Sequence, residues 1–182
     1  EIVLTEVVGN TLTRRYYADF VNSLEIGKDD KVLDYCSGSG IISKNITKKL
    51  GDGKLAYADV SEKWLAHAAK RLKRYKAAKG TRIDDFGSVI DDGGYDKIIV
   101  HFALHDFPKH YQNPVVNQLL DNLKPGGRLF FREPMGEGHG IKLHELINLI
   151  ESMKKLSYEY TIMEKPIIGK VVDVRCRLQI PV

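Results

Sequence analysis

The stretch VLDYCSGSG, Val32 to Gly40, constrains this chain more than any other segment. It is a short apolar run that ends in an acid and passes into a loop of small residues. Glycine adopts backbone angles that other residues avoid and lets a ligand approach the main chain closely. A strand, a glycine-rich loop and a helix in succession are typical of a nucleotide-binding unit, although a tight turn without a ligand gives the same pattern.

Strand and helix signals alternate along the whole chain. The predicted strands are Lys31–Tyr35, Lys54–Ala58, Thr81–Ile83, Tyr95–His101, Gly127–Glu133, Tyr158–Met163 and Val171–Leu178. The predicted helices are Thr11–Leu24, Ile41–Leu50, a helix capped by Ser61 and ended by Gly80, a helix with Asn113 as N-cap and Pro114 as first residue, and a helix through Leu143 and Met153.

This alternation predicts an α/β fold with a doubly wound, Rossmann-like sheet of seven strands. The sheet is expected to be mostly parallel with an antiparallel C-terminal strand, and to carry helices on both faces. In that last strand apolar residues alternate with charged ones, which predicts one solvated face. We expect a single domain over residues 1–182, whose N-terminal helical segment, 1–27, either packs on the sheet or acts as a lid.

Composition excludes several other classes of protein. Two cysteines, Cys36 and Cys176, are too few for a disulfide framework and indicate a reducing compartment. No apolar run has the length of a transmembrane helix, and no signal-peptide pattern is present. The formal net charge of +4 permits an anionic partner without indicating nucleic acid. We therefore expect a cytoplasmic monomer or homodimer with no membrane or nucleic-acid partner.

An acid at the end of the second predicted strand narrows the choice of nucleotide. Asp59 can accept hydrogen bonds from both hydroxyls of a ribose, or it can cap the helix that begins near Ser61. The loop lacks the third glycine of a dinucleotide fingerprint, and Asp34 would repel a pyrophosphate. These residues favour an adenosine ligand that carries a cationic or amine-bearing group.

Four motifs in order resemble the class I S-adenosylmethionine-dependent methyltransferases, in particular the small-molecule branch with quinone and sterol enzymes. The motifs are VLDYCSGSG, LAYADVSEKWLAHAAKRL, IDDFGSVIDDGGYDKIIVHFALHDFP and LKPGGRLFFREP, and the resemblance runs from about Leu12 to Leu178. It implies S-adenosyl-L-methionine as the cofactor and methyl transfer to a small-molecule acceptor as the reaction.

The resemblance also implies roles for individual residues. The first acid lies near the methionine part of the cofactor, the glycine loop passes beneath it, and the second acid holds the ribose. An acid after the third strand, either Asp85 or Asp84, accepts a hydrogen bond from the adenine. Cys36 stands where the family usually has its first glycine. The implied cofactor-binding residues are Asp34, Cys36, Gly38, Ser39, Gly40, Asp59, Val60, Asp85, Phe86 and His101.

Candidate catalytic residues follow the fourth and fifth strands. Methyl transfer mainly requires alignment of donor and acceptor, and a general base matters only if the acceptor must lose a proton. His105, with Asp106 beside it, has the pKa of such a base, although both residues could instead brace the turn before Pro108. Glu133 is a second acid–base candidate, or a salt-bridge partner of Arg132.

We expect no metal, because His101 and His105 are spaced for a helix but His101 falls in a predicted strand. His139 and His144 offer no better set. Three functional alternatives remain open. They are a methyltransferase of RNA or protein, a protein that binds the cofactor without catalysis, and a dehydrogenase that uses NAD.

Overall fold

Strand β1, Lys31–Tyr35, has the predicted bounds, and all of its residues after the first are buried. The computed structural model describes residues 14–84, 93–136, 139–153, 156–165 and 168–179. The chain divides into two compact units, one that ends at Ile83 and one that begins at Asp84. Each unit carries part of the expected alternation of strands and helices.

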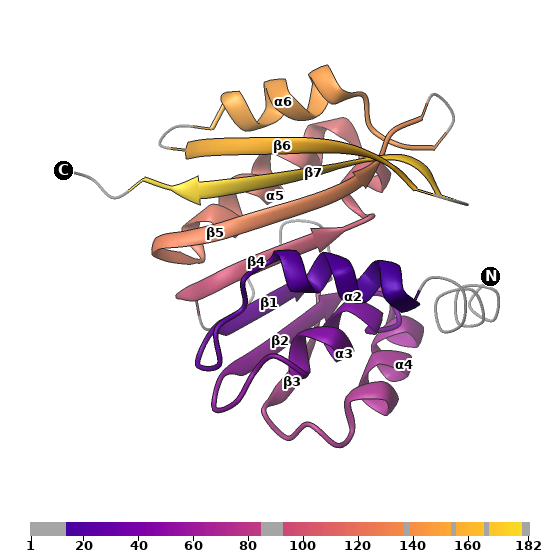
Figure 1. Cartoon of the computed structure of the whole chain (residues 1–182), viewed down its shortest axis with the longest axis vertical. Helices are drawn as coiled ribbons and strands as arrows, with labels where there is room; N and C mark the ends of the chain where they lie inside the picture. Colours follow the sequence, from indigo (N-terminus) through magenta and orange to yellow (C-terminus); the bar gives the residue numbers. More distant parts are fainter. Residues whose placement is uncertain (1–13, 85–92, 137–138, 154–155, 166–167, 180–182) are drawn as a thin grey trace. The chain divides into compact units, whose positions relative to one another are not determined.

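In the first unit three parallel strands pair in the order β3-β2-β1 (Figure 1). Helices α3 and α4 contact each other and strand β2. Short apolar strands separated by helices produce this arrangement, because crossover helices bury β1 and most of β2, whereas β3 has no fully buried residue. The elements are α2 (Arg14–Ser23), β1 (Lys31–Tyr35), α3 (Ile41–Thr47), β2 (Lys54–Asp59), α4 (Glu62–Leu72) and β3 (Ala78–Arg82).

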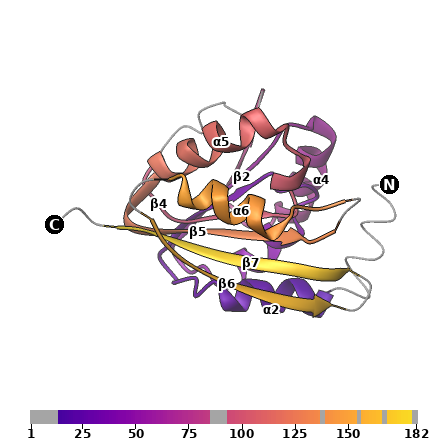
Figure 2. The same cartoon turned by 90° about the horizontal axis from the view of Figure 1, so that it is seen from above.

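In the second unit the strand order is β4-β5-β7-β6. Strands β4 and β5 are parallel, whereas β7 is antiparallel to both of its neighbours, as the sequence predicted. Figure 2 shows α5 and α6 on one side of β7. The elements are β4 (Tyr95–His101), the 3-10 turn η1 (Leu104–Asp106), α5 (Lys109–Asp121), β5 (Leu123–Pro134), α6 (Leu143–Glu151), β6 (Leu156–Lys165) and β7 (Gly169–Leu178).

Helices α3 and α6 end two or three residues earlier than predicted, at Thr47 and Glu151, and two other predicted helix boundaries are wrong by more. Helix α4 is capped by Ser61 as expected, but it ends at Leu72, and Gly80 lies within strand β3. A Cβ at Gly80 would come within 2.7 Å of the ring of Tyr57, so glycine is needed there for packing rather than as a helix stop. Tertiary packing overrides the local signal at this position.

The other wrong boundary is the start of α5. This helix begins at Lys109, directly after Pro108, and Pro114 lies inside it. Asn113 is therefore not an N-cap, and its side-chain oxygen instead accepts a hydrogen bond from Asn117 Nδ2 at 2.6 Å. The proline that precedes the helix sets its start, and the second proline is tolerated near the first turns.

The predicted solvated face of β7 is only partly present. Asp173 is buried, and its two carboxylate oxygens accept hydrogen bonds from Nε and Nη2 of Arg132 on β5, each at 2.5 Å. Arg132 therefore pairs with Asp173 and not with Glu133.

Among the described residues, no helix has both the length and the hydrophobicity to cross a membrane.

This buried ion pair gives a test of the second unit. Asp173→Ala should lower the free energy of unfolding by about 3–5 kcal/mol, because it removes the carboxylate that accepts two hydrogen bonds from a buried guanidinium. Glu159→Ala is the matched control. Glu159 of β6 pairs with Arg175 of β7, but its side chain is 72% exposed. Its substitution should lower the free energy of unfolding by less than about 1 kcal/mol. Urea unfolding of both variants measures the difference, and equal losses would contradict the assigned role of the buried pair.

Candidate functional site

The glycine loop lies between β1 and α3 and is held by main-chain hydrogen bonds. Ser37 N–H donates to the Ala58 carbonyl of β2 at 2.9 Å, and Gly40 N–H donates to the Ser37 carbonyl at 2.9 Å. Three loop residues have positive φ, namely Cys36 at 58°, Gly38 at 53° and Gly40 at 76°. A left-handed conformation at Cys36 explains why glycine is usual at this place, and it stores strain in the loop.

The two glycines of the loop have different surroundings. A Cβ at Gly40 would lie 2.9 Å from Cβ of Ala68 on α4, so this glycine permits close packing of the loop on the helix. A Cβ at Gly38 would meet no heavy atom within 4 Å. The main chain at Gly38 therefore faces open space, where a ligand could lie against it.

Asp59 ends β2 and joins the loop to the start of α4. Its Oδ2 accepts a hydrogen bond from Gly38 N–H at 2.8 Å, and its Oδ1 accepts one from Ser61 N–H at 2.9 Å. Ser61 Oγ in turn accepts a hydrogen bond from Trp64 N–H, as an N-cap does. Asp59 thus has a structural role beside any role with a ribose. Each carboxylate oxygen has a second lone pair that can accept from a hydroxyl.

Asp34, at the penultimate position of β1, is 1% exposed. Ser43 Oγ of α3 donates a hydrogen bond to its Oδ2 at 2.5 Å. Burial raises the pKa of Asp34 to about 7, and the negative charge of Asp59 adds to the increase, while the hydrogen bonds from Ser43 oppose it. A nearby positive charge on a ligand would favour the ionised form of this carboxyl group. The sequence did not identify Ser43 as its partner.

The other predicted cofactor residues are less informative. Ser39 is buried in the loop, and Val60 is an apolar side chain that is 38% exposed at the end of β2. Asp85 and Phe86 lie outside the described residues, so neither is placed against an adenine. His101 ends β4, where burial and the neighbouring Arg132 guanidinium lower its pKa to about 3. Its ring is therefore neutral at pH 7.

The three predicted catalytic residues lie together in the second unit. Glu133 of β5 is fully buried, and Nδ1 of His105 lies 2.6 Å from its Oε2. The backbone N–H groups of Ala103, Leu104 and His105 also donate to this carboxylate, at 3.2, 3.0 and 3.3 Å. Glu133 therefore braces the turn η1 and orients the imidazole, which is the structural interpretation, and the acid–base role of this group stays a prediction.

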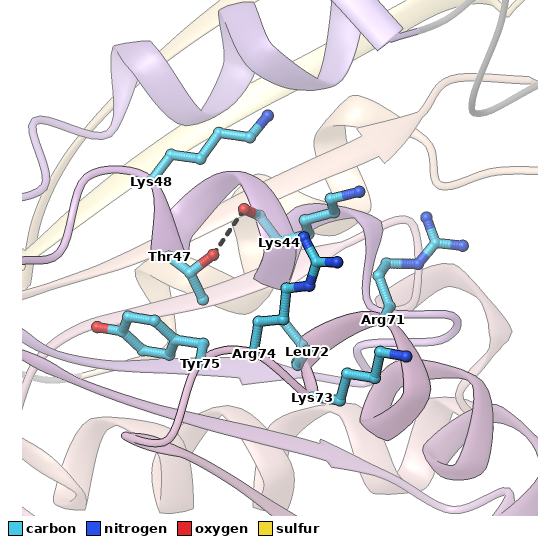
Figure 3. A pocket seen from close by; sticks show the side chains of 8 residues that line it. All are labelled: Lys44, Thr47, Lys48, Arg71, Leu72, Lys73, Arg74 and Tyr75. Carbon is cyan, nitrogen blue, oxygen red and sulfur yellow. Dashed lines mark hydrogen bonds between the residues drawn. The ribbon is translucent and has the colours of Figure 1, made fainter.

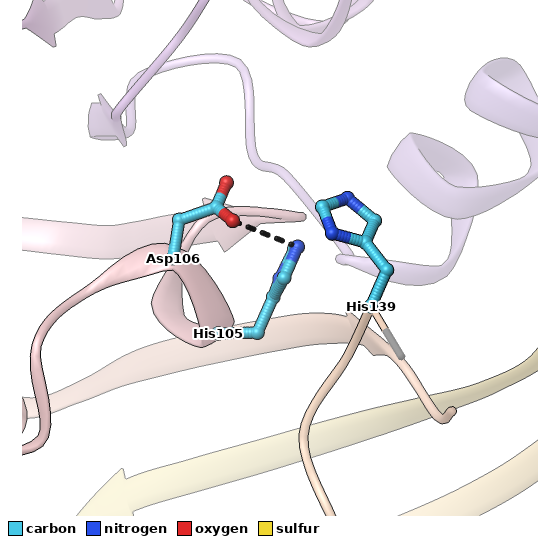
Figure 4. A group of neighbouring side chains, drawn as sticks. All are labelled: His105, Asp106 and His139. Carbon is cyan, nitrogen blue, oxygen red and sulfur yellow. Dashed lines mark ion pairs between the residues drawn. The ribbon is translucent and has the colours of Figure 1, made fainter. Parts of the chain in front are cut away.

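The charge around His105 matches that arrangement. Burial alone lowers its pKa, but the hydrogen bond and negative charge of Glu133, with Asp106 beside them, raise the pKa above its usual value. Figure 4 shows the ring of His105 with Asp106 and His139 next to it. The two imidazole rings meet edge to face, with centroids 4.9 Å apart and planes at 89°. His139, which the sequence analysis set aside, is thus a neighbour of the candidate base.

A cavity of about 400 Å³ lies elsewhere in the first unit (Figure 3). Its lining includes Lys44 and Lys48 at the end of α3, and Arg71, Lys73 and Arg74 at the end of α4. Cations at the C-terminal ends of helices stabilise them through the helix dipole. The glycine loop and Asp59 lie at the opposite, N-terminal ends of the same helices. The basic cavity therefore lies toward the C-terminal ends of α3 and α4, and the candidate cofactor loop lies at their N-terminal ends.

Comparison with known proteins decides the family. A family model described as a methyltransferase domain matches residues 32–127, more than half of the chain. This chain belongs to the methyltransferase domain family. The expected class I methyltransferase membership is confirmed, and the dehydrogenase alternative is set aside.

Two curated proteins are similar to this chain, and the matched part is a different share of each protein's own length. The ubiquinone/menaquinone biosynthesis C-methyltransferase UbiE of Neisseria meningitidis is 24% identical over 133 residues, which are 72% of this chain and 54% of the relative. The serine/threonine-protein kinase PKH2 of Saccharomyces cerevisiae is 31% identical over 113 residues, 62% of this chain but 10% of the kinase. The methyltransferase thus spans about half the length of UbiE and a small part of the kinase.

A solved structure confirms the fold. The N-methyltransferase NodS from Bradyrhizobium japonicum WM9, in complex with S-adenosyl-L-homocysteine, matches with a TM-score of 0.80 at 16% identity. The match covers 94% of this methyltransferase and 90% of NodS. The Rossmann-like methyltransferase fold with seven strands, mostly parallel and with an antiparallel strand near the C-terminus, is therefore the fold of this chain.

The different surroundings of the two loop glycines are testable. Gly40→Ala should destabilise the fold by a few kcal/mol, since its Cβ would lie too close to α4 and its φ is positive. Gly38→Ala, the matched variant, pays only for its positive φ and should cost roughly 1–2 kcal/mol. Thermal unfolding measures both variants. A larger loss in Gly38→Ala than in Gly40→Ala would contradict this account of the loop.

Proposed function

We propose that this chain binds S-adenosyl-L-methionine with its glycine loop and with Asp59, and transfers the methyl group to a small-molecule acceptor. The observation that carries the proposal is the network in which Asp59 accepts hydrogen bonds from Gly38 and Ser61. It joins a glycine loop to the acid that follows the next strand, which is the arrangement that adenosine ligands require. The bound cofactor supplies an electrophilic methyl group on a sulfonium centre.

The described residues of the loop fit such a ligand. Gly38 presents main chain to open space, and the hydroxyl of Ser37 is buried without a hydrogen-bond partner among the described residues. A buried polar atom of this kind is costly unless something satisfies it. Val60 offers an exposed apolar surface beside the acid that would hold the ribose. These features support a bound nucleoside better than they support a turn alone.

Asp34 supports a ligand that carries positive charge. Its carboxyl group titrates near pH 7 because it is buried with only Ser43 to donate hydrogen bonds. A cation close to the loop would complete the stabilisation of the ionised form. A sulfonium and an ammonium group satisfy this requirement, whereas a pyrophosphate does not.

On the acceptor side we assign His105, Asp106 and Glu133. Glu133 holds the Nδ1–H of His105, so the lone pair on Nε2 is free to meet the acceptor or its proton. Asp106 places a negative charge 3.4 Å from that nitrogen. Glu133 is thus a positioning residue, and the acceptor would meet the buried ring of His105 and the exposed carboxylate of Asp106.

A small-molecule acceptor is supported by the relatives and by the location of the basic cavity. UbiE is named for a step in quinone biosynthesis, a small-molecule pathway. The cluster of cations that would suit RNA lies toward the C-terminal ends of α3 and α4, whereas the glycine loop and Asp59 precede the N-terminal ends of these helices. The alternative of a protein that binds the cofactor without catalysis predicts normal affinity and no methyl transfer to any tested acceptor.

Titration calorimetry with S-adenosylmethionine, S-adenosylhomocysteine and NAD tests the cofactor assignment. Micromolar binding of the first two and none of NAD is expected. Asp59→Ala should weaken binding by roughly 1–3 kcal/mol because it removes the ribose acceptors. Asp52→Ala, an exposed acid of the same unit, should bind like the unaltered chain. Unchanged affinity in Asp59→Ala, in a variant shown to be folded by circular dichroism, would leave Asp59 only its structural role.

The raised pKa of Asp34 predicts a pH dependence. Its folded pKa of about 7 lies above the unfolded value of 3.8, so its contribution to stability is present below pH 4 and lost as pH rises through 7. Affinity for the cationic cofactor should rise over the same range, as the carboxylate forms. Asp34→Asn should flatten both profiles. A variant that keeps the original pH profile of binding would show that another group senses the cofactor.

A further inference from the structure

A second set of ligand atoms surrounds the candidate base. Nitrogen atoms of His105 and His139 and a carboxylate oxygen of Asp106 all lie within 4.8 Å of one another (Figure 4). His105 and Asp106 come from the turn η1 after β4, and His139 comes from the loop between β5 and α6. Residues that are distant in sequence thus direct three metal-binding atoms at one point.

The hydrogen bonding of His105 prepares one of these atoms for a metal. The carboxylate of Glu133 already accepts three backbone N–H groups, so the proton it shares with His105 lies on Nδ1 of the ring. Nε2 then carries a lone pair. This atom is buried in a side chain that is only 4% exposed, and among the described residues it has no hydrogen-bond partner.

Asp106 is too poorly placed to be that partner, yet it lies where a second ligand should be. Its Oδ1 is 3.4 Å from Nε2 of His105, and the pair does not satisfy hydrogen-bond geometry. In a tetrahedral site with bonds of about 2.1 Å, neighbouring ligand atoms are roughly 3.4 Å apart. A ring nitrogen of the exposed His139 lies within 4.8 Å of both atoms and completes the set.

We propose that His105, Asp106 and His139 bind a divalent transition-metal ion, with Glu133 as the carboxylate that orients His105. A carboxylate that holds the second nitrogen of a ligating histidine is the usual support of such sites. Two imidazoles and one carboxylate suit zinc or iron(II) rather than magnesium or calcium, which prefer oxygen ligands. Three protein ligands leave a position open for water or for an oxygen atom of the acceptor.

The proposed site departs from the expectation that no metal binds, because that expectation compared His105 with His101 and not with His139. The spacing of His101 and His105 argued against a helical pair, and that argument stands. The partner that the fold supplies is His139, whose place depends on where the chain returns after β5. A lone pair on Nε2 that is given to an ion is not available to a proton, so the metal-bound and base roles of His105 exclude each other.

Equilibrium dialysis of the full chain, stripped with EDTA and then exposed to ZnCl₂, tests the site with metal content as the readout. One zinc per chain is expected. His139→Ala and Asp106→Asn should each weaken binding at least tenfold, and Glu133→Gln should weaken it about 10–100-fold. His144→Ala removes another exposed histidine of the same unit and should bind like the unaltered chain. MgCl₂ should not compete.

Two further measurements keep the outcome clear. Cys36→Ser should retain zinc, which excludes binding by the partly exposed thiol of the glycine loop. Substitution with Co²⁺ should give an absorption spectrum of four- or five-coordinate cobalt without a thiolate band. No bound zinc, or binding that survives His139→Ala unchanged, would overturn the proposal. Neither result would affect the cofactor assignment, because calorimetry with S-adenosylmethionine tests residues of the other unit.

Discussion

The first unit depends on the carboxylate of Asp59, which accepts hydrogen bonds from two backbone amides. Asp59 ends β2, yet its oxygens accept from the loop after β1 and from Ser61, the N-cap residue of α4. Without it, the N–H groups of Gly38 and Ser61 would lose their carboxylate acceptor. The same loop also packs closely on α4, where a Cβ at Gly40 would lie 2.9 Å from Cβ of Ala68.

In the second unit, too, a carboxylate on a strand holds a neighbouring loop by accepting hydrogen bonds. Glu133 near the end of β5 collects three backbone N–H groups from the turn after β4 and one imidazole. In both units an acid on one strand holds the loop that follows the neighbouring strand. Parallel strands bring such an acid and such a loop to the same level, because their carboxyl ends point the same way. In the proposed sites, the loop of the first unit offers the main chain at Gly38, and the turn of the second unit offers Nε2 of His105.

Most of this arrangement could be predicted from the sequence, and the exceptions have physical causes. Strands β1, β2 and β4, the cap at Ser61 and the acids Asp34, Asp59 and Glu133 follow from local pattern, whereas β3 spans Ala78–Arg82 and not the predicted Thr81–Ile83. The end of α4 and the start of α5 do not, because Gly80 serves the ring of Tyr57 and Pro114 is tolerated within a helix. Burial of Asp173 was missed, since alternation cannot show that a charge on the outer face has Arg132 opposite it. His139 was missed because its neighbours depend on the path of a loop.

The buried acids differ in what they still lack. Glu133 has four donors and Asp59 is bonded at both oxygens, so their hydrogen-bonding needs are largely met within the chain. Asp34 is buried as deeply but depends on Ser43 alone, and its pKa of about 7 reflects that shortage. An asparagine at position 34 would avoid the cost of burying a carboxyl group. A buried acid is costly without a cation and useful with one, so the shortage of donors at Asp34 supports the proposal of a cationic ligand at the glycine loop.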